Sequence, residues 1–550
     1  MQRKMIIIFL ICMLLITGCN KKMDNKISNV RENQNVPDKL VVYLSAAPHG
    51  FQKGGVATGD NIEYLYPSKH IVGTRMVGGE LNCLGGNVFA QALQEYSNKT
   101  DIEIEIHYVE ENNSEKDIFE ILDETDELPD LILLNKHSQY DYYRLAQQGY
   151  LVDFSVFMEE ELKDETMYYQ KVINGGRVEG QQVILPILFN LNGMITSKSY
   201  IEQIGCEEFS REITYDDVLY TLQQSCVKMA DMQQKEAIFE ASGLMLGGTY
   251  IPSIMMGAGH TSYFDEDIGS VNISSETVAD ILELMRLYNR QEFGIDPDWE
   301  NKTYLENLSN KDIKSGLLTA LAMDTYSQVG IFLSGGRSGG INFHNSLLTD
   351  AAYFNSMYSK DGEEMVLCGI PTVAEAGTYS ANMSVLAAGF STTEYPKAVY
   401  DLARYMMDYK YPSAYGFSVN KEVTEEQLEE IQNTTTVLYS DGIWSSVIAG
   451  IKTEEEIESE IEIIQPLDSR YVEEIQFMLD HMAGAGVPFG TLEYHIFNTA
   501  LESVADNDVT CQEVGDWVVD TLEVYLERYE ELEAFVDRNY IESLKKFEIS

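Results

Sequence analysis

The sequence predicts an α/β fold divided into at least two lobes. An apolar strand at 40–44 is followed by a helical pattern at 88–96, an alternating strand at 102–106, a helix at 118–122 and an apolar strand at 129–134. This alternation predicts parallel strands joined by right-handed crossovers. The chain has 550 residues, and this length is more than one hydrophobic core usually organises. Since 44% of the residues are hydrophobic, the chain can build a large core.

The first nineteen residues predict export and a lipid anchor. Arg3 and Lys4 precede an apolar run over 5–16, which is shorter than the ~20 residues that cross a bilayer. Ile16-Thr17-Gly18-Cys19 resembles the bacterial lipobox, in which cleavage precedes a cysteine that carries diacylglycerol. We expect a signal peptide at 1–18 and lipidation of Cys19; the alternative is an ordinary secretory peptide with an incidental cysteine.

The segment that follows reads as a connection rather than as part of the core. Residues 19–39 hold the lipidated cysteine and a polar, Asn- and Lys-rich stretch that predicts a flexible tether. After the first strand, the Gly-rich segment 46–86 is too long for a simple loop, which indicates a functional or family-specific insertion.

Charge and cysteine spacing exclude several classes of function. The net charge of −51 repels nucleic acid and anionic lipid surfaces, and it argues against a free anion as ligand unless the site is locally basic. Beyond Cys12 and Cys19 the five cysteines are widely spaced and show no zinc-binding pattern. We expect no metal, no other cofactor and no nucleic-acid partner.

Short motifs along the chain carry a family resemblance through their order and spacing. They lie at 129–133 (PDLIL), 145–154 (LAQQGYLVDF), 179–186 (EGQQVILP), 321–324 (LAMD), 369–371 (GIP), 416–421 (GFSVNK), 502–520 and 522–527. Together they resemble the carbohydrate-binding extracellular solute-binding proteins of ABC importers, the family that includes maltose-binding protein. The resemblance spans residues 40–530.

This resemblance implies a two-lobe, periplasmic-binding-protein-like fold of mixed sheets flanked by helices, in which crossing hinge strands join the lobes and close on a ligand. It places crossings near 189–193, 365–369 and 389–392. Lobe one would hold 40–190 plus 366–388, and lobe two 191–365 plus 389–550.

The resemblance also implies where a sugar would bind, through aromatic faces for the ring and amides or carboxylates for the hydroxyl groups. The implied ligand-binding residues are Ser45, His49, Asn135, Asn190, Asn192, Asp324, Tyr326, Tyr379, Asn382 and Tyr494. Trp444, in a polar loop without a family counterpart, is a further candidate. The alternative for each is a core or surface residue, and for His49 a structural histidine.

Two segments match parts of enzyme or metal-binding motifs but lack the sequence context that those motifs require. Residues 336–340 (GRSGG) satisfy the G-x-S-x-G pattern but lie in a Gly-rich stretch without the strand-turn-helix context of a nucleophile. Asp296, Asp298 and Glu300 lack the glycine of a calcium loop. Glycosidase carboxylate pairs stay open among 89 acidic residues.

The sequence therefore predicts a non-enzymatic binding protein on the extracytoplasmic face of the cell membrane. The protein would be a monomer. It would capture a small-molecule solute, a carbohydrate, by hinge closure and deliver it to ABC permease subunits. The alternatives are a surface-anchored glycan hydrolase and a peptide-binding receptor.

Overall fold

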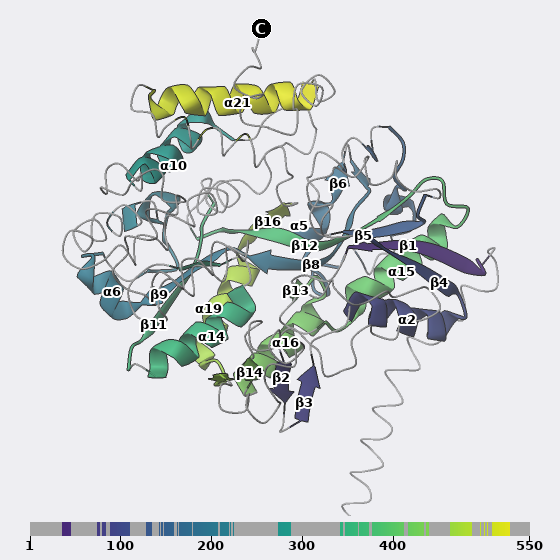
Figure 1. Ribbon diagram of the computed structural model, residues 1–550, viewed down its shortest axis with the longest axis horizontal. Helices are drawn as coiled ribbons and strands as arrows, with labels where there is room; N and C mark the ends of the chain where they lie inside the picture. Colours follow the sequence, from purple (N-terminus) through teal and green to yellow (C-terminus); the bar gives the residue numbers. More distant parts are fainter. Residues whose placement is uncertain are drawn as a thin grey trace, which may run out of the picture.

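A computed structural model describes the folded parts of the protein (Figure 1). The described residues are 36–45, 74–77, 80–83, 88–109, 128–134, 142, 145–146, 148–158, 162, 164–178, 180–206, 209–218, 220–221, 224, 273–287, 342–344, 347–360, 362–372, 377–411, 416–433, 436–438, 462–486, 496, 500, 503 and 509–527. The predicted signal peptide and Cys19 lie outside them. Within the described part of the chain, no helix combines the length and hydropathy that crossing a bilayer needs.

A seven-stranded mixed sheet forms the larger half of the described fold, with strand order β13-β8-β12-β5-β1-β4 and with β16 beside β12. Strand β1 runs parallel to β4 and β5, as the sequence predicts, whereas β12 is antiparallel to β5 and β8. The strands are β1 (Lys39–Ser45), β4 (Glu103–Val109), β5 (Leu131–Leu134), β8 (Leu185–Leu191), β12 (Tyr379–Gly389), β13 (Phe417–Ser418) and β16 (Met482–Gly486).

Apolar residues on the strands and on the covering helices build the core of this sheet. The side chains of Leu40, Val42 and Leu44 are at most 1% exposed. Helix α15 (Pro396–Asp408) begins with a proline, whose fixed φ suits a first helical turn, and contacts β8, β12 and helix α2 (Val88–Thr100). Its buried residues recur at helical spacing: Val399, Leu402, Ala403 and Met406.

A separate three-stranded sheet lies at the opposite end of β8 and β12 from β1 and β4 (Figure 1). Strand β9 (Gly193–Ser197) pairs antiparallel with both β10 (Asn342–His344) and β11 (Met365–Gly369). Helices α6 (Lys198–Gln203) and α14 (Leu347–Lys360) contact this sheet. The predicted class, α/β with mixed sheets flanked by helices and joined by crossing strands, is confirmed.

In the described part of the chain, three connections pass between the two sheets. The single residue Asn192 separates β8 from β9, and residues 370–378 lead from β11 into β12. The third connection is helix α19 (Ser469–Asp480), which contacts β11 and continues through His481 into β16.

Two of the expected crossings differ in place from the structure. Strand β11 belongs wholly to the three-stranded sheet, so the second crossing follows 365–369 instead of coinciding with it. Residues 389–392 do not leave the larger sheet, because Gly389 O accepts from Val152 N at 2.8 Å and Phe390 N donates to Asp130 O at 3.0 Å. Accordingly α15 and β13, which the resemblance assigns to lobe two, lie on the seven-stranded sheet.

The remaining elements are short or peripheral. Helices α10 (Ser275–Leu287) and α21 (Cys511–Glu527) pack on each other, with Gly515 so close to Ser275 that a Cβ would lie 2.4 Å from its carbonyl oxygen. Figure 1 shows this pair at the top. The others are β2 (Thr74–Val77), β3 (Glu80–Cys83), η2 (Phe154–Val156), α5 (Gln170–Asn174), β6 (Arg177–Val178), β7 (Gln181–Gln182), α16 (Lys421–Asn433), β14 (Thr436–Leu438) and β15 (Glu462–Ile464).

Candidate functional site

Asn192 is the point at which the strand crossings are tied together. Its side chain is fully buried, and it is the only residue between β8 and β9. Its carbonyl oxygen accepts from Ile370 N at 3.1 Å, at the exit of β11. Its side-chain Oδ1 accepts from Nδ2 of Asn382, on β12, at 2.8 Å. One residue thus connects segments of both sheets.

Asn190 lies two residues earlier and brings a second amide to the same region. The residue is partly buried, and its Oδ1 is inaccessible to solvent with no hydrogen-bond donor among the described residues. Because a buried acceptor without a donor is costly, such atoms are uncommon and invite a functional explanation.

Gly416 fits closely against this amide. A Cβ at Gly416 would lie 2.6 Å from Asn190 Oδ1, 2.7 Å from the Phe189 carbonyl oxygen and 3.2 Å from Ser384 Oγ. The glycine has φ +115°, which L side chains rarely adopt. Backbone conformation and close approach both require glycine here, so Asn190, Ser384 and Gly416 form one compact polar contact.

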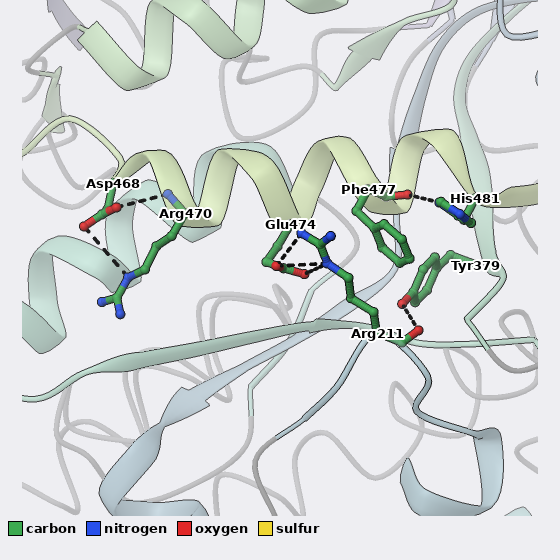
Figure 2. A network of polar contacts seen from close by, with 7 residues as sticks. All are labelled: Arg211, Tyr379, Asp468, Arg470, Glu474, Phe477 and His481. Carbon is green, nitrogen blue, oxygen red and sulfur yellow. Dashed lines mark hydrogen bonds and ion pairs between the residues drawn. The ribbon is translucent and has the colours of Figure 1, made fainter.

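Tyr379, a predicted ligand residue, is packed under α19. Its side chain is 2% exposed, and its ring meets Phe477 edge-on at a centroid distance of 6.3 Å (Figure 2). Its backbone N–H donates to the carbonyl of His481 at 3.1 Å. Burial, with contributions from Cys368 and Glu474, raises the pKa of the Tyr379 phenol. The neutral ring therefore packs between the start of β12 and α19, where the second and third connections meet.

Arg211, Glu474, Phe477 and His481 form a cluster beside this tyrosine along α19. No sequence motif predicts this cluster. Arg211 donates to Glu474 through Nε at 3.1 Å and Nη2 at 2.8 Å, and its guanidinium lies 4.4 Å from the centre of the Phe477 ring. The imidazole of His481 stacks on Phe477 at 3.9 Å, and the hydrogen bond to Glu474 raises the pKa of Arg211. Figure 2 shows these side chains along one side of α19.

Besides Tyr379, four of the predicted ligand-binding residues lie in the described part of the chain: Ser45, Asn190, Asn192 and Asn382. Asn192 and Asn382 are hydrogen-bonded at the first crossing, and Asn190 lies two residues before Asn192 on β8. Ser45 is the last residue of β1, and β1 pairs in parallel with β5, so the carboxyl ends of the two strands share one edge of the sheet. The predicted residues outside the described part of the chain are His49, Asn135, Asp324, Tyr326, Trp444 and Tyr494.

The side chains at the first crossing, which we call the crossing cluster, are neutral hydrogen-bonding groups: Asn190, Asn192, Asn382 and Ser384. Asparagine amides both donate and accept, and a serine hydroxyl does the same. Over the described residues, no three or more His, Cys, Asp or Glu side chains lie close enough together to hold a metal ion. The arrangement suits hydrogen bonding and positioning, and it contains no pairing of nucleophile and base among Asn190, Asn192, Asn382 and Ser384.

Comparisons with known proteins detect similarity through structure alone. No family model matches the sequence, and no curated protein matches it. Many similar solved structures are extracellular solute-binding proteins or sugar-binding proteins. A family 1 extracellular solute-binding protein from Alicyclobacillus acidocaldarius is 12% identical, covers 90% of this chain and 100% of its own, and has a TM-score of 0.46.

Two further structures are similar to the same degree. The protein CpMnBP1, solved with mannotriose bound, is 12% identical over 88% of this chain and 98% of its own, with a TM-score of 0.49. An ABC substrate-binding protein from Listeria monocytogenes, solved with cycloalternan, is 12% identical over 88% and 97%, with a TM-score of 0.46. At such identities and TM-scores, the ligand and activity of this chain do not follow from theirs.

Proposed function

We propose that the protein is a lipid-anchored, extracytoplasmic solute-binding protein that captures a neutral carbohydrate and passes it to ABC permease subunits. The observation that carries the proposal is the crossing at Asn192, where a single buried residue joins two sheets and is tied to two other chain segments. A fold divided in this way can change the angle between its halves with few backbone changes.

The chemistry of the crossing supports a hydroxyl-rich ligand. Amide groups match sugar hydroxyls, because each can donate to one oxygen and accept from another. Asn190, Asn192, Asn382 and Ser384 are all neutral, so this group carries no cationic side chain that would favour an anion. The net charge of −51 adds a long-range repulsion toward acidic solutes. We therefore propose neutral sugars over uronates or phosphosugars.

Capture would work by a population shift between two angles of the sheets. A ligand that contacts both halves stabilises the closed arrangement by the free energy of the contacts it makes only there. No bond is broken in this cycle, so the proposed role is binding and delivery without covalent chemistry.

Titration calorimetry and solution scattering on the protein lacking residues 1–18 test the proposal together. We expect heat of binding with a neutral oligosaccharide and a smaller radius of gyration at saturation. An oligogalacturonide of equal length is the matched acidic control, and an unrelated peptide tests the receptor alternative. Chromatography of the sugar after incubation tests the hydrolase alternative. Binding of peptides alone, or release of shorter sugars, would contradict the proposal.

Tyr494 is the proposed stacking residue, by its place in the family pattern. An aromatic ring against a sugar face contributes on the order of 1 to 3 kcal/mol. We expect Tyr494→Ala to weaken binding roughly tenfold to a hundredfold and Tyr494→Phe to weaken it less. Unchanged affinity in a folded Tyr494→Ala protein would remove this residue from the site.

A further inference from the structure

Asn382 makes its hydrogen bond diagonally across the strand pair. Met383 of β12 is opposite Phe189 of β8 in an antiparallel register. The register shifts between Met383 and Val385, and Asn382 and Asn190 are the next residues along the two strands beyond the Met383–Phe189 pair. The amide of Asn382 nevertheless donates to Asn192, two residues further along, at 2.8 Å.

Asn190 and Asn192 therefore offer two acceptors to the one side-chain amide of Asn382, of whose two N–H groups one donates to Asn192. Asn190 lies within β8, and Asn192 is the first residue after the end of that strand, so the two amides stand two residues apart at its exit. One oxygen, on Asn192, is engaged by Asn382. The other, on Asn190, is buried with no donor among the described residues.

The surroundings limit which of these groups can move. Gly416 approaches Asn190 so closely that even a methyl group would lie 2.6 Å from its Oδ1. Asn190 is thus confined by backbone, whereas Asn382 is partly exposed.

The two acceptors also belong to different parts of the hinge. Asn190 lies within β8, in the same sheet as Asn382, and stays beside β12 when the angle between the sheets changes. Asn192 lies at the junction with β9, and its carbonyl is tied to Ile370. A rotation of the smaller sheet therefore moves Asn192 relative to Asn382 and leaves Asn190 in place.

We propose that Asn382 is a two-position hinge residue: it donates to Asn192 in the present arrangement and transfers to Asn190 when the sheets rotate. The transfer satisfies the buried acceptor of Asn190 at the moment when the bond to Asn192 is lost. This inference rests on the proposed function only in assuming that the two sheets move.

Distance measurements on the unliganded protein test the inference without knowledge of the sugar. Spin labels carried by non-natural amino acids report the separation of the two halves by pulsed electron resonance. They are placed at Val156 of η2, which is 72% exposed, and at Gln203, an exposed residue of α6, which contacts β9. The variants are Asn190→Leu and Asn192→Leu, each close in size to asparagine and without an acceptor. Asn433→Leu on α16, an exposed position, is the matched control.

We expect opposite shifts between two distance populations. Asn190→Leu should deplete the rotated population and Asn192→Leu should enrich it, each by roughly twofold to tenfold. Adding Asn382→Ala should remove the difference between the two variants, since the shared donor is then absent. Asn433→Leu should leave the ratio unchanged.

Shifts in the same direction, or a single distance in all proteins, would overturn the inference. If Asn192→Leu fails to fold, Asn190→Leu alone decides, because an unchanged ratio in that variant contradicts the transfer. The outcome is separable from the proposed function. If the protein binds sugar but shows a single distance, only the hinge role of Asn382 is rejected. If the opposite shifts occur but no sugar binds, only the proposed carbohydrate ligand is rejected.

Discussion

Gly369 lies directly against Tyr379, so that a Cβ on the glycine would stand 2.5 Å from Cδ1 of the tyrosine ring. The same Cβ would lie 2.5 Å from Sδ of Met478, on α19. The exit of β11, the start of β12 and the helix of the third connection therefore meet at a position where only glycine fits.

Gly369→Ala should destabilise the protein by about 1 to 3 kcal/mol, because a buried methyl group forces the ring and the thioether apart. Denaturant midpoints measure the loss. In a Tyr379→Leu background the ring is gone, so the second substitution should cost less than the two single effects added together. Simple additivity would argue against this contact.

Tyr471 gives a prediction for alkaline pH. Its hydroxyl donates to the carbonyl oxygen of Met365 at 2.6 Å, and burial raises its pKa to about 12. In the unfolded chain a tyrosine loses its proton near pH 10, whereas the folded protein keeps it. The contribution of Tyr471 to folding stability is therefore fully present below pH 10 and is lost as the pH rises toward 12.

Tyr471→Phe should flatten this decline between pH 10 and 12 while costing about 1 kcal/mol at pH 7 for the lost hydrogen bond. Urea unfolding at both pH values measures the two effects. An unchanged slope in the variant would assign the alkaline decline to other tyrosines.

Two arginines should differ in their contribution to stability. Arg404 pairs with Asp408 and donates to Tyr168, and the arginine and aspartate side chains are 19% and 21% exposed. Arg404→Met leaves Asp408 in a partly buried position without its cation and should cost about 3 kcal/mol.

Arg211 is the matched comparison, since it also combines a carboxylate with an aromatic ring but is 47% exposed. Solvent screens its pair with Glu474, so Arg211→Met should cost clearly less stability than Arg404→Met, with a further decrease in high salt. Thermal unfolding at two salt concentrations checks both variants, and equal losses would contradict the role of burial.

The lipid anchor is tested at Cys19. Cys19→Ala removes the proposed acceptor of diacylglycerol, so the protein should leave the detergent phase in phase partitioning and take up no labelled fatty acid. A serine or alanine at Cys368, which is buried on β11, controls for loss of an unrelated thiol. Equal labelling of parent and Cys19→Ala would reject lipidation at this position.

The local part of the fold was predictable from sequence because its signals are local. Alternation in Ile102, Ile104 and Ile106 and the apolar run at 129–134 predict strands, and the helix between the first two strands predicts their parallel pairing. The pairing of β12 with β5 and β8 depends on residues more than 190 positions apart, for which no short pattern exists. Family analogy placed a crossing at 389–392, where backbone hydrogen bonds to Val152 and Asp130 keep the chain on the larger sheet.

The candidate site divides in the same way. The family resemblance implies Asn190 and Asn192 at the first crossing and Asn382 after the return strand, and a hydrogen bond joins Asn192 to Asn382. The Arg211–Glu474 pair joins residues 263 positions apart on the surface, and neither residue stands out among 38 basic and 89 acidic side chains. Such contacts depend on tertiary packing alone.

The central place of β12 has a consequence for how the chain acquires its structure. Residues 379–389 pair with β5, β8 and β16. The backbone groups of β5 and β8 on that side therefore stay unpaired until this segment is present, and β16 follows later in the chain. Such long-range pairing slows folding and leaves adhesive strand edges exposed in nascent or truncated chains. A fragment ending before 379 would therefore be a substrate for proteases and chaperones, and the order of synthesis delays closure of the larger sheet until more than two thirds of the protein has been made.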